Sequence, residues 1–182
     1  TTIRLLKRSG FKVINEDATQ LIKSEQRRAR LDPSYEPCLP WVVSNLTQFQ
    51  AGVLKRQLAN EGRINGAPYT FLDRGHIDNL GYCRWGNIEL PDGLEDAISY
   101  AGYTAVVFLD QIPQNLYRRT KGREEDYGLA IKKYEIIRSV YERTCPELGI
   151  PLYRIPFDEP ISRAAQILSL LNLDEAIINR VA

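Results

Sequence analysis

Asp73, Arg74 and Gly75 place an acid, a base and a flexible backbone directly after a predicted buried strand. The strand, 69–72, is predicted because aromatic, β-branched and aliphatic residues favour extended backbone. Ligands of an open parallel sheet bind beyond the carboxyl ends of its strands. There Asp73 can hold a metal-bound water or accept a proton, and Arg74 can bind phosphate. The alternative is a strand that ends in solvated charges.

Acidic residues also follow two other predicted strands. Glu16 comes directly after the short strand 11–15, where it either contacts the hydroxyl of an acceptor or pairs with Arg74. Asp110 ends the strand 104–110, which is apolar on both faces, as a buried parallel strand is. Asp110 is interpreted as a cap of that strand end. The carboxyl ends of these strands are predicted to meet at one edge of the sheet.

Strands and helices alternate along the chain, which predicts an α/β domain with a mainly parallel sheet. A fourth strand covers 151–156, and helices are predicted over 1–9, 17–30, 41–61, 92–102, 127–143 and 161–171, the third of them with Ser44 or Asn45 as its cap. The aromatic segment 76–90 has no clear periodicity, so it is predicted as an irregular wall or lid over a ligand, with Tyr82 as a contact. His76, the single histidine, is interpreted as a loop residue and not as a catalytic one.

A densely charged segment follows the strand 104–110. It contains Arg118, Arg119 and Arg123, and it has no apolar residue between Thr120 and Asp126. Weak packing of such a segment predicts a mobile lid, about 118–127, whose arginines reach a transferring phosphate. The alternative is a solvated helix face.

The composition is that of one ordinary globular domain, 1–182. The chain has 182 residues, of which 43% are hydrophobic and 26% charged, enough for one sizeable core. Its net charge of +1 creates no electrostatic field that would attract nucleic acid or an anionic membrane, so neither is a predicted partner. The three cysteines match no metal-ligand spacing, and free thiols in a reducing cytoplasm are the simplest interpretation. No apolar run has the length of a membrane span.

Several short motifs occur in an order that is more specific than any one of them. They are Thr1-Thr2, Glu16, Leu39-Pro40-Trp41, Asp73-Arg74-Gly75 and Tyr117-Arg118-Arg119 with Arg123. In this order, from Thr1 to about Leu171, the chain resembles the P-loop kinase-like NTPases. Among these it is similar to the AAA-type ATPase family that includes the ribosylnicotinamide kinase domain.

The resemblance implies a three-layer fold whose parallel sheet has the strand order 2-3-1-4-5. The chain opens at Thr1-Thr2, where the family has the last residues of its phosphate-binding loop, and it contains no methionine. The first strand and the glycines and lysine of that loop are therefore expected upstream of Thr1, over roughly 13 to 18 residues of the natural protein. A chain without them is expected to bind ATP or GTP poorly, since each lost charge-assisted contact is worth ~1.5–3 kcal/mol.

The resemblance also implies a function, an Mg²⁺-dependent ATPase or a small-molecule, nucleoside-like kinase that uses ATP or GTP. The alternatives are an NTP-dependent switch with a protein partner and a non-catalytic nucleotide-binding module. Asp73 would bind the metal or act as base, and Arg74 would bind acceptor phosphate or brace Asp73. The resemblance further implies that Glu16 and Tyr82 contact the acceptor and that the Thr1 hydroxyl binds the metal. The residues that it implies for nucleotide binding are Thr1, Thr2, Asp158 and Pro160.

Overall fold

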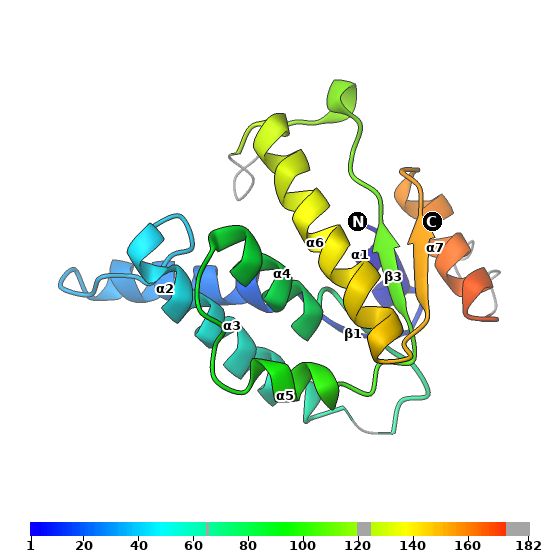
Figure 1. Ribbon diagram of the computed structural model, residues 1–182, viewed down its shortest axis with the longest axis horizontal. Helices are drawn as coiled ribbons and strands as arrows, with labels where there is room; N and C mark the ends of the chain where they lie inside the picture. Colours follow the sequence, from blue (N-terminus) through cyan, green and yellow to red (C-terminus); the bar gives the residue numbers. More distant parts are fainter. Residues whose placement is uncertain (65, 120–124, 174–182) are drawn as a thin grey trace. The chain divides into compact units, whose positions relative to one another are not determined.

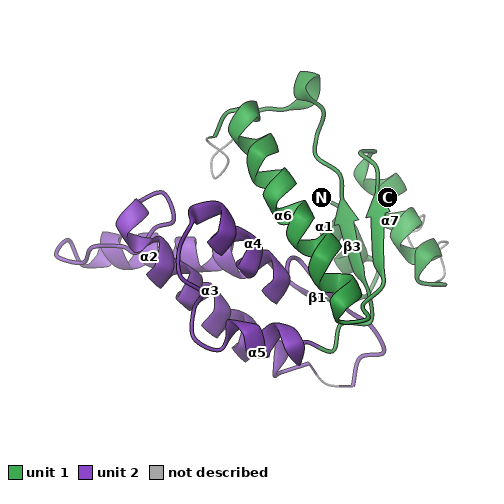
Figure 2. Ribbon diagram, in the orientation of Figure 1, with its two compact units in different colours: residues 1–13, 102–182 green, residues 14–101 purple. Residues whose placement is uncertain are grey.

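The computed structural model describes residues 1–64, 66–119 and 125–173. The chain divides into two compact units, unit 1 (1–13 and 102–182) and unit 2 (14–101), coloured separately in Figure 2. The helices of unit 1 are α1 (Thr2–Arg8), η2 (Gln114–Leu116), α6 (Tyr127–Glu147) and α7 (Pro160–Leu170), and its strands are β3 (Val106–Leu109) and β4 (Leu152–Ile155). Unit 2 contains α2 (Asp17–Leu31), η1 (Val43–Asn45), α3 (Leu46–Glu61), β2 (Thr70–Leu72), α4 (His76–Gly86) and α5 (Leu94–Ser99). Strand β1 (Lys12–Ile14) lies at the boundary.

Unit 1 is built in layers around two parallel strands. Strand β3 pairs with β4 in the register Val106 with Leu152 to Leu109 with Ile155. Helices α6 and α7 lie on opposite sides of this pair, and α1 packs against α7 (Figure 1). The ring of Phe108 fixes α6 to its face of the pair, because its centroid lies 5.4 Å from the ring centroids of both Tyr134 and Tyr141.

Unit 2 is mainly helical, with α3 packed against α2 and α4, and α4 packed against α5. Its core consists of large apolar side chains that are at most 5% exposed: Phe49, Val53, Leu54, Ile77 and Leu94. A polar contact joins α2 to α3, since Asn60 Nδ2 donates to Asp17 Oδ1 at 2.7 Å. Burial raises the pKa of Asp17, and the contacts with Arg56 and Asn60 oppose that effect.

The predicted α/β class is confirmed, and each of the four predicted strands is present but shorter. The paired strands of unit 1 are parallel, as predicted. In unit 2 the Asp73 N–H donates to Ile14 O at 2.9 Å, so the residue after β2 lies beside the end of β1. The order 2-3-1-4-5 and the single-domain boundary 1–182 stay predictions. No helix in the described part of the chain combines the length and apolar character that crossing a bilayer requires.

The prediction of an irregular segment over 76–90 is wrong, because residues His76–Gly86 form α4. Gly75 is the N-cap, and its N–H donates to Asp78 Oδ2 at 3.2 Å, which satisfies one amide at the helix start. Asn87 ends the helix in the left-handed conformation, with φ of +48°. An acid at the third helical position was the local signal for this helix.

Of the third predicted helix, 41–61, the first residues are not α-helical, because α3 begins at Leu46 and not at Trp41. Trp41 is 60% exposed and Val43 is 85% exposed, so no packing surface selects a helix there. Asn45 is the N-cap of α3, one of the two predicted caps, although its side chain makes no capping hydrogen bond.

His76 is the first residue of α4 and is only 3% exposed, which corrects its interpretation as a loop residue. Its Nδ1 lies 3.2 Å from Ala97 O on α5, and its Nε2 lies 3.4 Å from the Glu61 carboxylate. Burial lowers the pKa of His76, and the hydrogen bond to Ala97 opposes this shift. The ring is therefore a structural link between helices of unit 2.

This burial predicts how the stability of the protein depends on pH. Since the folded pKa of His76 lies below its ordinary value of 6.5, the unfolded chain binds more protons as the pH falls through 6.5. The free energy of unfolding is expected to decrease in that window and to level off below the folded pKa. Urea titrations from pH 7.5 to 5 test this.

His76→Gln is the matched variant for this test. It is expected to lose about 1 kcal/mol at pH 7.5, the worth of one hydrogen bond, and to show a flatter pH dependence than the wild type. A wild-type protein that gains stability on acidification through 6.5 would show instead that pairing with Glu61 outweighs burial.

Candidate functional site

The candidate site of unit 2 begins where β2 ends. Because the Asp73 N–H pairs with Ile14 O, the two chain segments lie side by side at this point. Glu16, two residues beyond Ile14, is thereby brought to Arg74, whose Nε donates to Glu16 Oε1 at 2.6 Å. Thr19 Oγ1 donates to the other Glu16 oxygen at 2.5 Å. Of the two predicted roles of Glu16, the structure shows the pair with Arg74.

Arg74 is held by a second acid and by a ring. Its Nη1 donates to Asp78 Oδ1 at 3.0 Å, and its guanidinium carbon lies 5.4 Å from the centroid of the Tyr82 ring. Asp78 and Tyr82 both come from α4, so the helix that follows the motif also orients its arginine. Two carboxylates that bind one guanidinium fix its direction more firmly than one could.

The backbone of Arg74 is strained, with φ of +78°. A side-chain-bearing residue in the left-handed region costs about 1–3 kcal/mol, and such residues cluster at functional sites. Here the ion pairs with Glu16 and Asp78 compensate for the strain. The conformation turns the chain sharply between Asp73 and the start of α4.

The carboxylate of Asp73 is half-buried, and no side chain in the described ranges donates a hydrogen bond to it. Burial raises the pKa of Asp73, and the negative charge of Glu16 raises it further. Arg74 acts in the opposite direction, and Asp78 adds a smaller upward effect. A carboxylate with these properties can accept a proton or bind a cation.

The residues predicted to bind nucleotide in unit 1 lie at the starts of two helices. Thr1 caps α1 through its carbonyl, which accepts from Arg4 N–H at 3.0 Å, and Thr2 is only 8% exposed. Pro160 is the first residue of α7. The Asp158 carboxylate accepts from Glu159 N–H at 2.8 Å and from the Ser162 hydroxyl, and the latter bond is the main cause of its lowered pKa. Asp158 therefore shapes its own loop.

The arginines of the predicted lid are described only in part. Arg118 is exposed, and its Nη1 donates to the carbonyls of Asn115 at 3.0 Å and Tyr117 at 2.9 Å. Arg119 is exposed, and Arg123 lies outside the described residues. Tyr117 is buried, and its hydroxyl donates to Glu125 O at 3.1 Å. This hydrogen bond joins Tyr117, just before the predicted lid, to Glu125, near the end of the lid.

A comparison with models of protein families identifies the family of this chain. A family model described as an AAA domain matches residues 1–162. The chain belongs to this AAA domain family. The predicted resemblance to P-loop NTPases of AAA type is confirmed, and with it a nucleotide-binding, NTPase-like function at this coarse level. Neither the search of curated proteins nor that of solved structures found a match.

AAA domains generally bind nucleotide together with Mg²⁺. Within the described ranges, no three His, Cys, Asp or Glu side chains are grouped so that they could hold a metal ion. Mg²⁺ in nucleotide sites, however, is bound by one or two carboxylates and by the substrate phosphates. The carboxylate of Asp73 in this AAA domain fits such a role, since no described side chain occupies it.

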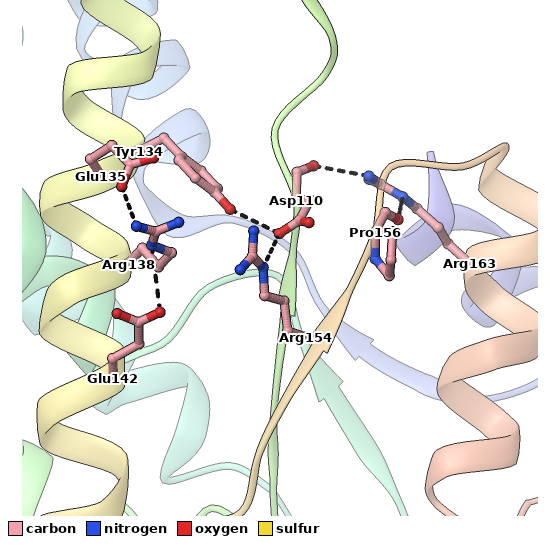
Figure 3. Close-up of polar contacts among 8 residues, drawn as sticks. All are labelled: Asp110, Tyr134, Glu135, Arg138, Glu142, Arg154, Pro156 and Arg163. Carbon is pink, nitrogen blue, oxygen red and sulfur yellow. Dashed lines mark hydrogen bonds and ion pairs between the residues drawn. The ribbon is translucent and has the colours of Figure 1, made fainter.

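The structure adds residues that the sequence reasoning missed. Asp78 lies four residues after Arg74, a helical spacing that signals an ion pair. In unit 1 of the AAA domain, Asp110 Oδ1 accepts from Tyr134 Oη at 2.8 Å and from Arg154 Nε at 2.6 Å (Figure 3). Burial alone would raise the pKa of Asp110. The two hydrogen bonds have the larger combined effect, so the pKa of Asp110 lies below its ordinary value. Asp110 therefore does more than cap β3, since it joins β4 to α6.

Proposed function

We propose that this protein transfers the γ-phosphoryl group of ATP or GTP to the hydroxyl of a small, nucleoside-like acceptor in an Mg²⁺-dependent reaction. The observation that carries the proposal is the state of Asp73. Its carboxylate is half-buried, has a raised pKa and receives no hydrogen bond from the described side chains. The strained, doubly paired Arg74 beside it has the character of a functional residue.

In this reaction Asp73 is the general base. The acceptor oxygen bonds to the γ-phosphorus as the bond to the nucleoside diphosphate breaks, and Asp73 takes the proton that the hydroxyl loses. The raised pKa of Asp73 makes it a better proton acceptor than an exposed aspartate. Bound Mg²⁺ would neutralise charge on the phosphate oxygens, and Asp73 is the residue of unit 2 that would hold it through water.

The charges around Asp73 support an acceptor without a phosphate group. Glu16, Asp73 and Asp78 are three carboxylates around one guanidinium, and Arg74 is already bound to two of them. A phosphorylated acceptor would be repelled by the excess negative charge, whereas a hydroxyl donates to a carboxylate. Tyr82, under Arg74 on α4, offers a ring for an apolar or planar part of the acceptor.

A turnover assay of the full-length protein tests the proposal. ATP or GTP is supplied with Mg²⁺, and nucleosides are compared with their 5′-monophosphates as acceptors. We expect transfer to a nucleoside-like hydroxyl and much weaker transfer to the monophosphates. Phosphate release that ignores the acceptor would favour an NTP-dependent switch, and binding without turnover would favour a non-catalytic module. Absence of nucleotide binding would overturn the proposal.

A further inference from the structure

The turn between β2 and α4 is held together by Asp78, the third residue of α4, which is only 7% exposed. The N–H of Asp78 donates to Gly75 O at 3.1 Å, and its Oδ2 accepts from Gly75 N–H at 3.2 Å. The two residues are therefore bound to each other in both directions. These bonds fix the backbone directly after Arg74.

The other carboxylate oxygen of Asp78 holds the side chain of Arg74, since Oδ1 accepts from Arg74 Nη1 at 3.0 Å. One acid thus fixes both the guanidinium of Arg74 and the peptide group that follows this residue. The backbone of Arg74 is left-handed, with φ of +78°. Neighbouring contacts must enforce that conformation, because it is unfavourable for a residue with a side chain. Glu16, the second acid on Arg74, binds the guanidinium only.

This arrangement requires a carboxylate at position 78. One donor from the backbone and one from a guanidinium reach its two oxygens, and an ionised carboxylate accepts at both. An asparagine has one acceptor oxygen, and its NH₂ group would face the other donor. Such a residue can retain the bond to Gly75 N–H only by losing the bond to Arg74. The two contacts of Asp78 can therefore be separated by substitution.

Helix α5 shows that a helix start of this kind does not itself need a buried acid. It also follows a glycine N-cap, Gly93, and it also has an aspartate as its third residue, Asp96. Asp96 is exposed, and no arginine of the described chain is bound to it. Asp78 differs from Asp96 in its burial and in its contact with Arg74, while both occupy the same position of a helix.

We infer that Asp78 is a positioning residue of the reaction, which acts through Arg74 and does not touch substrate. The inference rests on the proposed function, in which Arg74 lies beside the base Asp73. The contacts of Asp78 lie between residues 74 and 78, so this part of the chain itself directs the guanidinium. A charge that is already directed stabilises a transition state without the cost of reorganisation.

The test is a double-mutant cycle in which Asp78→Asn is made in the wild type and in Arg74→Ala. Phosphoryl transfer by the full-length protein is measured with ATP, Mg²⁺ and a mixture of the common ribonucleosides. In the wild type we expect kcat to fall about tenfold, the effect of one lost charge-assisted hydrogen bond, and the KM for ATP to change less than about twofold. In Arg74→Ala the same substitution should change kcat less than about twofold, because its target is absent.

Asp78→Ser serves if the asparagine variant does not fold, as judged by thermal melting. The serine hydroxyl can accept from Gly75 N–H but is too short to reach Arg74, so we expect the same values of about tenfold and less than twofold. Asp96→Asn is the matched control at the start of α5. Its kcat should stay within about twofold of the parent protein in both backgrounds.

The outcomes separate the inference from the proposed function. A folded Asp78 variant that retains the wild-type kcat, or that loses equally in the wild type and in Arg74→Ala, would overturn the positioning role and leave the transfer reaction intact. An Asp96→Asn variant with the same coupling to Arg74 would also overturn it, because any acid at a helix start would then have the effect. A wild-type protein that transfers no phosphoryl group would overturn the proposed function itself.

Discussion

Asp73→Asn is expected to lower phosphoryl-transfer turnover by about 10²-fold or more, the usual effect of removing a general base or a metal-binding carboxylate. Asparagine has nearly the same shape, so the fold should be kept. The KM for nucleotide and for acceptor should change much less than turnover, because the lost interaction belongs to the transition state. Steady-state kinetics of the full-length protein with its acceptor measure this effect.

The same substitution should leave the protein as stable as the wild type at pH 7, or more stable. The pKa of Asp73 is raised in the folded state, so ionisation of this group disfavours folding above its ordinary value of 3.8. Asparagine removes that effect and the repulsion from Glu16. Asp92→Asn, an exposed acid of unit 2, is the control and should change neither property. Unchanged turnover with unchanged melting would make Asp73 a bystander.

Arg74→Ala is expected to reduce kcat/KM by about 10²-fold, the scale on which a preorganised charge contributes to a transition state. It leaves Glu16 and Asp78 without their shared partner, and it removes the positive charge that lowers the pKa of Asp73. The pKa of Asp73 should therefore rise further. The acid limb of the pH–rate profile should move to higher pH, which a loss of packing alone would not cause.

Arg74→Lys should restore less than about tenfold of this loss, because an ammonium cannot form both contacts of the planar guanidinium. Arg84→Ala is the matched control, since Arg84 is an exposed arginine on the same helix α4. Its rate and its pH profile should equal those of the wild type. An acid limb that stays in place in Arg74→Ala would contradict the electrostatic link between Arg74 and Asp73.

Local sequence patterns predicted most of the elements. The strands 69–72 and 104–110 were identified by β-branched and aromatic runs, and β2 and β3 lie within them. The helix 127–143 has an acid at its N-cap, Asp126, whose side chain accepts from Leu129 N–H at 2.8 Å, although α6 continues to Glu147. These features depend on neighbours within one or two turns, so periodicity and capping reveal them.

The helix α4 shows where the local pattern was insufficient. Its aromatic residues, such as Tyr82, and two glycines weaken the helical periodicity, and only burial of residues such as Ile77, which is 0% exposed, against other helices makes the helix stable. The opposite holds at Trp41–Val43, where apolar residues favour a packed helix but find no surface to pack against. Tertiary packing decided both segments.

For the site, residue types and their places after predicted strands were enough to name the candidate side chains. A strand followed by Asp73, Arg74 and Gly75, and Glu16 after another strand, were sufficient to predict acids and a base at strand ends. Which of these side chains have a partner depends on the folded chain. Arg74 takes Glu16 and Asp78 as partners, Asp73 receives no hydrogen bond from the described side chains, and Arg163 bridges two strand ends. These contacts join residues up to 58 positions apart, and hydrogen bonds depend on distances of a few tenths of an ångström, which no local pattern specifies.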